Sequence, residues 1–461
     1  MRLRRQRAPR GTAAVDEVPS TLTETAPRVL GVFDQIGLWG NLGVSLLGFT
    51  GAAVVLYPDG PGSPHISVVA ALVAIAIGTL LGSAAIALSA IPGAQTGAPA
   101  MVLLRGLLGS RVSYLPTALN IAQMIGWGTF ELVTIATAAN TVLPSVPAWT
   151  WIVAAGALTT LLSLRPLGSV RLLRRYVTVA VLIALLYLFV QLLSHPLPSL
   201  TEGGWTGFSV AVDTTVAVAV SWVPMAADYA RHSRSSSAAF TGAFVGYGLA
   251  QIACYALGVL ALVTVAADEN QIFAAFIAVP LGGLAFAVLA IREIDQSFAN
   301  VYSTTVSTQN LRPGWDRRKI SLVVGVLTMV LALSVDIYGY ASFLSLIGSV
   351  FVPLFAVLAV DYFLLSGRST WDLTPNSRSR WPMVLPWLFG FVTYQLIYPG
   401  QVAWWAGFWE SITRAIGFVP QAWMSASLTS FLVAVVTTLA VGAHQSMRQA
   451  RRRDTSDSQT A

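Results

Sequence analysis

Charged residues are scarce in this chain. Asp, Glu, Lys and Arg make up 10% of its 461 residues, whereas 55% are hydrophobic and the mean hydropathy is +0.69. Soluble domains carry about 25% charged residues, so the composition excludes an ordinary soluble domain. Apolar runs close to the roughly 20 residues that a spanning helix needs recur along the chain. The sequence therefore predicts an all-α integral membrane protein.

Cysteine and histidine are also rare. The single cysteine, Cys254, excludes a disulfide within the chain, and one cysteine with four histidines supplies a metal centre poorly. The motifs H-E-x-x-H and G-x-S-x-G are missing, so a membrane enzyme is the weaker prediction and no organic cofactor is expected. The basic start leads into a polar stretch at 11–27, so no cleavable signal is expected. A sensor or scaffold would need a folded soluble domain, for which the tails are too short.

The apolar runs predict twelve membrane spans. They lie at 31–57, 67–92, 114–142, 149–165, 176–193, 207–229, 238–266, 273–301, 319–336, 339–364, 382–399 and 424–443. Arginines gather in alternate loops, which fall on the same side as both termini. The positive-inside rule then places both ends in the cytoplasm of a plasma (inner) membrane. The net charge of +7 comes largely from these loops and tails, which predicts contact with lipid rather than nucleic acid, notably at 451–453.

Two spans carry helix-breaking residues. Span one holds five glycines between Gly37 and Gly51, together with Asn41 and Ser45. They indicate either close helix packing or a broken helix whose free carbonyls bind an ion. Span six holds Pro224, which removes a backbone donor. Asp228 and Arg231 follow it, three residues apart on one face, where they could pair.

Span three carries an aromatic residue one turn from a carboxylate. Gln123, Trp127 and Glu131 recur every fourth residue and share one helix face. This arrangement suits a flat ring with N–H donors. The alternative is that Glu131 pairs with an arginine such as Arg292 and that Trp127 only packs. Carboxylates inside a membrane are functional by default, which favours the site.

Span eight contains the most polar stretch, Ile291–Asn300, which reads I-R-E-I-D-Q-S-F-A-N. Each ionised group at the bilayer centre costs about 2.5–3.5 kcal/mol. We therefore expect Glu293, Asp295, Gln296 and Asn300 to form one wall of a substrate and ion site. The alternative is a salt-bridge network that holds helices together, with Arg292 the first candidate for that role.

The polar and interrupted spans recur at an interval of five. Spans one and six are interrupted, and spans three and eight carry central polar groups. Five is odd, so the two halves are inverted in the membrane, which indicates an inverted-repeat transporter with its site at the midplane. The predicted organisation is a disordered tail at 1–29, a first repeat at 30–193, a second repeat at 207–364, spans eleven and twelve at 382–443, and a tail at 444–461.

At three motifs the chain resembles the nucleobase–cation symporter family of purine–cytosine permeases. The motifs are N-I-A-Q-M-I-G-W ending at Trp127, S-W-V-P followed by D-Y-A-R in span six, and F-A-N-V-Y-S-T in span eight. The resemblance covers about residues 25–440. It implies a five-plus-five inverted repeat of the amino-acid–sodium symporter type that works by alternating access.

The resemblance also assigns substrate contacts. Trp127 matches the aromatic residue that stacks on the substrate ring. Glu131 falls where relatives place a polar side chain on the ring edge, and Asn300 matches the amide of span eight that reads the substrate. The second stacking residue falls near Ala219, which is not aromatic, so Trp222 is expected to substitute.

The ion site implied by the resemblance departs from the family pattern. The backbone carbonyls that bind sodium in relatives map near Trp39 and Leu42 in span one and near Ile291 in span eight. The hydroxyl ligands map onto Ile294 and Asp295, so a carboxylate stands where a hydroxyl is expected. Asp295 suits either a direct Na⁺ contact or a proton, since a hard cation takes oxygen ligands.

The sequence thus predicts a symporter that imports a purine, pyrimidine or related planar heterocycle with Na⁺ or H⁺. Gln296 is expected to join Glu131 and Asn300 in pairing with the ring. An amino-acid carrier of the same fold is the alternative, and it would need a helix N-terminus free for a carboxylate. No obligate protein partner is expected.

Overall fold

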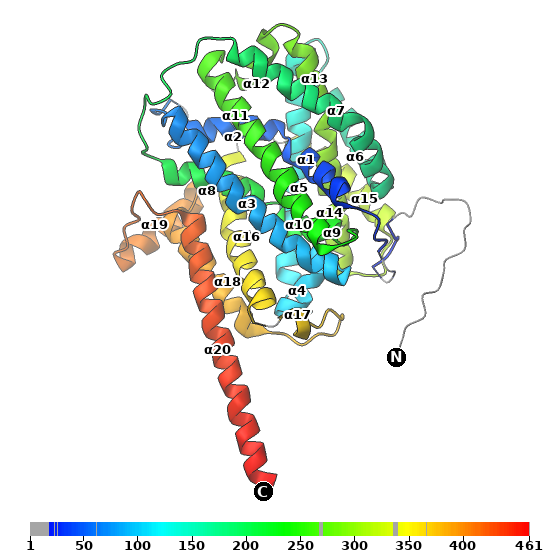
Figure 1. The fold of residues 1–461 in the computed structure, drawn as a ribbon, viewed down its shortest axis with the longest axis vertical. Coiled ribbons are helices and arrows are strands. Elements are labelled where there is room, and N and C mark those ends of the chain that lie inside the picture. The colour runs from blue at the N-terminus through cyan, green and yellow to red at the C-terminus, as the bar shows by residue number, and fades with distance from the viewer. Residues whose placement is uncertain are drawn as a thin grey trace, which may run out of the picture.

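The computed structural model describes residues 18–22, 24, 26–60, 62–266, 271–334, 340–365 and 367–460. Within them the chain is helical, and β-pairing is confined to two isolated bridges. The helices are α1 (Val32–Gly43), α2 (Leu46–Leu56), α3 (Val68–Thr96), α4 (Ala100–Leu108), α5 (Tyr114–Val142), α6 (Ala148–Ser163), α7 (Pro166–Leu193), α8 (Phe208–Val220), α9 (Val223–Ala230), α10 (Ser236–Thr241), the π-helix η1 (Gly242–Tyr247), α11 (Gly248–Thr264), α12 (Ile272–Ala278), α13 (Gly282–Arg292), α14 (Ile294–Leu311), α15 (Arg317–Ala332), α16 (Tyr340–Phe363), α17 (Gly367–Thr370), the 3₁₀ helix η4 (Trp381–Met383), α18 (Val384–Ile397), α19 (Ala403–Ile416) and α20 (Ala426–Thr460). Figure 1 shows them gathered in one bundle, from which the end of α20 projects.

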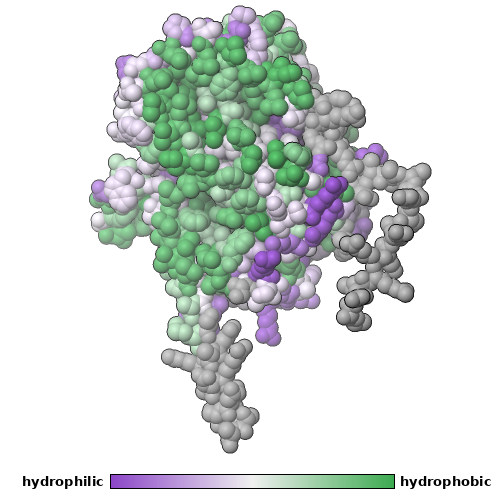
Figure 2. Space-filling view, viewed as in Figure 1, coloured by the Kyte–Doolittle hydropathy of each residue, from purple (hydrophilic) through white to green (hydrophobic). Residues whose placement is uncertain are grey.

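The outer surface of the bundle is apolar. Figure 2 shows hydrophobic side chains over most of one face, with hydrophilic ones gathered towards its edges. On α7 the side chains of Leu182, Ile183 and Leu186 are each more than 60% exposed. Among the described residues, five helices are each long and apolar enough to cross a membrane, and α1 with α2 forms a sixth candidate. This surface is that of a multi-pass membrane protein, in which lipid replaces water around the bundle.

The interior is packed through small residues. A Cβ added at Gly43 of α1 would lie 2.8 Å from the carbonyl oxygen of Tyr247 in η1. A Cβ added at Gly82 of α3 would lie 2.3 Å from the Cβ of Ala219 in α8. Glycine at these positions lets neighbouring backbones approach closely, as in other membrane bundles. Close packing is therefore one of the roles that the span-one glycines have.

Most predicted spans coincide with helices, but span eight does not. The run 273–301 contains the separate helix α12 and the pair α13–α14, and α14 continues to Leu311. The chain leaves α12 at Val279, which is extended and precedes Pro280, as expected for the residue before a proline. Leu281 then adopts a left-handed conformation, with φ of 49°, before α13 begins.

Other boundaries also differ from the prediction. Helices α4 and α19 lie in segments expected to be loops. Helix α20 continues through most of the predicted C-terminal tail, because no proline or glycine follows Gly442 and its alanine, glutamine and arginine residues favour helix. The predicted tail at 1–29 overlaps the described residues from Val18 onward, where Val29 and Leu30 donate backbone hydrogen bonds to the carbonyl oxygen of His232.

Candidate functional site

Span one is broken at its centre. Helix α1 ends at Gly43 and α2 begins at Leu46, and the two axes are bent by 58°. Ser45 lies in an extended conformation between them, and its Oγ accepts a hydrogen bond from the backbone N–H of Leu47 at 3.1 Å. The hydroxyl thus caps α2. The break leaves backbone carbonyls and N–H groups that the helices do not pair.

Span eight supplies the partners for this break. The Gln296 amide donates to the carbonyl oxygens of Leu42 and Val44, at 2.6 and 2.9 Å. The Glu293 carboxylate accepts from the Ser45 hydroxyl at 2.9 Å and from the Leu46 N–H at 3.2 Å. The first turn of α14 and the residue that precedes it therefore hold both sides of the break. A carboxylate at the N-terminus of α2 also interacts favourably with the helix dipole.

Span eight has its own interruption at the same level. Helix α13 ends at Arg292 and α14 begins at Ile294, so Glu293 occupies the junction. The guanidinium of Arg292 lies 3.4 Å from the Glu293 carboxylate, and both side chains are buried. This ion pair confirms that Arg292 takes part in a buried salt bridge, although its partner is Glu293 rather than Glu131.

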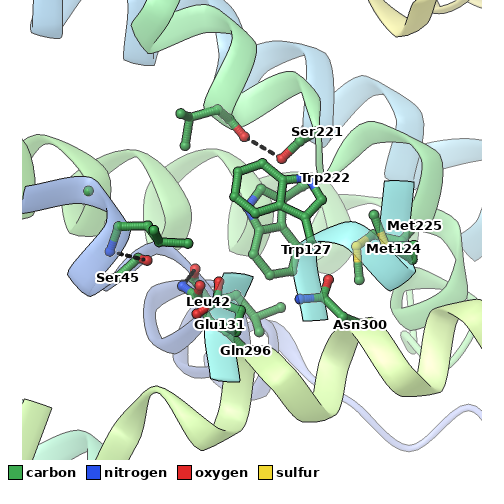
Figure 3. Close-up of a pocket in the computed structure, with 13 residues that line it drawn as sticks. Leu42, Ser45, Met124, Trp127, Glu131, Ser221, Trp222, Met225, Gln296 and Asn300 are labelled. Atoms are coloured by element: carbon green, nitrogen blue, oxygen red, sulfur yellow. Dashed lines mark hydrogen bonds between the residues drawn. The ribbon is translucent and has the colours of Figure 1, made fainter. Parts of the chain in front are cut away.

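A small cavity lies where these breaks meet (Figure 3). Its volume is about 20 Å³, which is room for about one water molecule. It is lined by Leu42, Ser45, Leu47, Gly48, Met124, Trp127, Glu131, Val218, Ser221, Trp222, Met225, Gln296 and Asn300. These residues come from spans one, three, six and eight, the four spans that the sequence singles out. Two indoles, a carboxyl group and two amides thus surround one buried point.

Six predicted site residues line this cavity, namely Leu42, Trp127, Glu131, Trp222, Gln296 and Asn300. Gln123 does not line it. Its amide donates to Asn120 Oδ1 at 2.9 Å and to the Ser221 carbonyl at 3.4 Å, and so supports the wall from behind. Ala219 packs against Gly82 of α3, while Trp222 lines the cavity from the next turn.

The remaining predicted ion residues lie outside the cavity. The Trp39 ring is fully buried and packs edge-on against Trp222, Tyr229 and Tyr247. The side chain of Ile291 is 65% exposed on the outer surface, which leaves its backbone as the part able to serve an ion. Asp295 is buried, and its Oδ1 has no hydrogen-bond partner among the described residues. Within the same residues, no three His, Cys, Asp or Glu side chains gather as a metal site.

At the end of span six, the polar side chains of Asp228 and Arg231 bind other parts of the bundle. Asp228 accepts from the Ala100 N–H at 2.9 Å and from the Ser303 hydroxyl at 2.8 Å, which fixes the start of α4 and the middle of α14. Arg231 donates to the Tyr302 hydroxyl and to His232 Nε2, both at 3.3 Å. No ion pair joins Asp228 to Arg231 in the part of the chain that the structure describes, so the pairing that the sequence suggested is not formed.

His232 is held as a neutral ring. Its Nε2 accepts from Arg231, so Nδ1 carries the hydrogen and donates it to the Pro27 carbonyl at 2.9 Å. Burial, together with the positive charge of Arg231, lowers the pKa of His232 from 6.5 to about 3. The ring therefore stays uncharged at neutral pH and links the residues before α1 to the end of α9.

A second, larger cavity of about 710 Å³ opens one or two turns farther along α2, α5 and α8. Tyr57, Asp213, Tyr394 and Tyr398 are among its lining residues. The Asp213 carboxylate accepts from the Ser425 hydroxyl and from two backbone N–H groups at the start of α20, at 2.5, 2.7 and 3.1 Å. The start of helix α20 is thereby fixed to α8, the first half of span six.

Several of these contacts were not anticipated from the sequence. Glu293 was expected in the wall, but not at the N-terminus of α2. Met124, Val218 and Met225 line the cavity although nothing polar marks them. Ser45 carried a usable signal, because a serine directly before an apolar run is a helix N-cap pattern.

Comparisons with solved structures show the fold. The chain is similar to MHP1, a nucleobase-cation-symport-1 family transporter, in a closed conformation with bromovinylhydantoin bound (TM-score 0.70, 17% identity, 94% of this chain and 96% of that one). It is also similar to the inward-facing conformation of Mhp1 (TM-score 0.66, 17% identity, 95% of each chain). A Na⁺-coupled sialic acid symporter in an outward-open state matches at TM-score 0.52 and 11% identity, over 89% of this chain and 95% of that one. The predicted fold of this transporter type is thus confirmed.

A comparison with curated protein sequences finds no match. A comparison with protein families finds a match over residues 60–374, which is more than half of the chain. The matched region includes the walls of the site that come from spans three, six and eight. This match agrees with the resemblance seen in the sequence motifs and makes the protein a transporter rather than an enzyme. The chain belongs to the family of permeases for cytosine/purines, uracil, thiamine and allantoin.

Proposed function

We propose that the protein imports a nucleobase or a related planar heterocycle across the plasma membrane by symport with Na⁺ or H⁺. The observation that carries this proposal is the buried cavity where broken spans one and eight meet, lined by the indoles of Trp127 and Trp222, the Glu131 carboxyl group and the amides of Gln296 and Asn300. Indole faces suit a flat ring, and polar groups around its edge select the ring by hydrogen bonding.

The substrate enters from the larger cavity in this proposal. The two cavities share walls from α2, α5 and α8, and the larger one has ample room for a purine. The smaller one holds about one water molecule, so its side chains must separate before a ring can enter. The first half of span six and the second half of span one are the elements placed to move, which agrees with alternating access.

The coupling ion is assigned to the region between α1 and Asp295. The free Oδ1 of this buried carboxylate suits a sodium ion or a proton. The Leu42 carbonyl, which accepts from the Gln296 amide, has a second lone pair that a sodium ion could use. Binding of the ion then strengthens binding of the substrate, and binding of the substrate strengthens binding of the ion by the same factor.

The structure offers less support for an amino-acid carrier. Such a carrier needs a helix N-terminus free to bind the substrate carboxylate. The N-terminus at the break of span one is already occupied by the protein's own Glu293 carboxylate. We also place both termini in the cytoplasm, because the basic loops lie on that side.

Uptake into proteoliposomes tests the proposal. We expect labelled hypoxanthine, cytosine or guanine to accumulate under a Na⁺ or pH gradient, with amino acids failing to compete. Trp127→Ala should abolish uptake, whereas Trp205→Ala, at a loop residue that is 55% exposed, should retain it. Uptake that amino acids block and bases do not would refute the proposal. The gradient that drives uptake identifies the ion.

A further inference from the structure

The polar atoms of the cavity differ in what they can still accept or donate. The two hydrogens of the Gln296 amide are given to the Leu42 and Val44 carbonyls, so this side chain offers a ligand only its Oε1. The Ser221 hydroxyl donates to the Val218 carbonyl at 2.6 Å. The Ser45 hydroxyl donates to Glu293 at 2.9 Å. Towards a ligand these three side chains can therefore only accept, and the Ser45 oxygen already accepts from the Leu47 N–H.

Glu131 adds a further acceptor. It is 1% exposed, and its Oε2 has no hydrogen-bond partner among the described residues. Two charged groups of span eight, the Glu293 carboxyl group and the Arg292 guanidinium, lie close to it. A hydrogen shared between the two carboxyl groups lies on the side of Glu293, which leaves Oε2 of this cavity-lining residue as an acceptor.

Donors in the cavity are fewer. The Trp222 ring packs edge-on against Tyr247, with ring centroids 6.3 Å apart. The Asn300 amide lines the cavity and carries both an NH₂ donor and a carbonyl acceptor. Figure 3 shows Glu131 and Gln296 together at one end of the cavity and Asn300 farther along α14. Among the cavity's polar groups, Glu131 and Gln296 thus place two acceptors next to each other, and the donors on the remaining wall include the Asn300 amide and the Trp127 indole N–H.

Resting on the proposed function, we infer that the transported ring presents two adjacent N–H donors to Glu131 and Gln296 and a carbonyl to Asn300. This is the edge of a 2-amino-6-oxopurine, where a C=O, a ring N–H and an amino group follow one another. A ring with a second carbonyl in place of the amino group places its oxygen against an acceptor oxygen of Glu131 or Gln296, and the two oxygens repel each other. A ring without the amino group leaves a buried acceptor unpaired, which costs binding.

Competition against one labelled base, with full-length protein in proteoliposomes, tests the inference. Unlabelled guanine should inhibit about 10- to 100-fold more strongly than hypoxanthine, which lacks the amino group, or xanthine, which has an oxo group there. Glu131→Gln gives this side chain an amide able to donate. It should reduce the preference for guanine over xanthine by about tenfold or more. Glu202→Gln, at an exposed loop residue, should leave the preference unchanged.

The outcomes separate this inference from the proposed function. Preference for guanine that Glu131→Gln weakens supports both. Base uptake in which xanthine or uracil competes as well as guanine overturns the inference and leaves the symporter standing. Failure of every base to be taken up or to compete overturns both. Quenching of tryptophan fluorescence by each base in the wild-type protein gives the same ranking without a variant, so poor folding of Glu131→Gln cannot obscure the result.

Discussion

Gln296→Met removes the amide that closes the break in span one while keeping a side chain of similar length. Two hydrogen bonds are lost, at 2.6 and 2.9 Å, and their acceptors are the carbonyls of Leu42 and Val44, residues that are 1% and 6% exposed. A buried acceptor left unpaired costs about 1–3 kcal/mol, so the free energy of unfolding should fall by about 2–6 kcal/mol. One water molecule fits the cavity and can satisfy one carbonyl, which favours the lower end of this range.

The assay compares unfolding of purified wild-type and variant protein in the same detergent, followed by tryptophan fluorescence, together with uptake in proteoliposomes. Gln251→Met is the matched control. That amide is equally buried, but it donates a single bond, to the Thr215 carbonyl at 3.0 Å, away from both breaks. We expect the control to lose about half as much stability and to keep transport. If Gln296→Met is as stable and as active as the wild type, the break does not depend on this amide and the reasoning fails.

Two further predictions concern the ends of the spans. Asp213→Ala removes the acceptor for three donors at the start of α20, so the free energy of unfolding in detergent should fall by about 0.5–2 kcal/mol. Asp213→Asn should have an intermediate effect. An unchanged unfolding midpoint would contradict the capping role of Asp213. The pKa of His232 is lowered from 6.5 to about 3, so below pH 6.5 the unfolded chain binds a proton that the folded chain does not. The free energy of unfolding should therefore fall by about 1.4 kcal/mol per pH unit down to about pH 3, and His232→Gln should remove that part of the acid sensitivity measured in pH-dependent melts.

Periodicity and composition determined the outline of this protein. Apolar runs of spanning length predict helices because a bilayer offers no partner for an unpaired backbone group. A helix pairs these groups within its own segment, so the prediction needs only the local sequence. The interruptions in spans one and six were also readable, since glycine and proline act on their own backbone. Trp127 and Glu131 were recognisable because helical spacing places them on one face.

The tertiary structure alone decided which groups meet at the breaks. Nothing local in the sequence says that Gln296 donates to Leu42 and Val44, or that Glu293 caps α2, because these residues are about 250 positions apart. The split of span eight depended on an extended Val279 before Pro280 and a left-handed Leu281, which an apolar run conceals. Hydropathy measures how well each residue suits lipid, whereas the site depends on which acceptors remain free after the protein has paired its own polar groups.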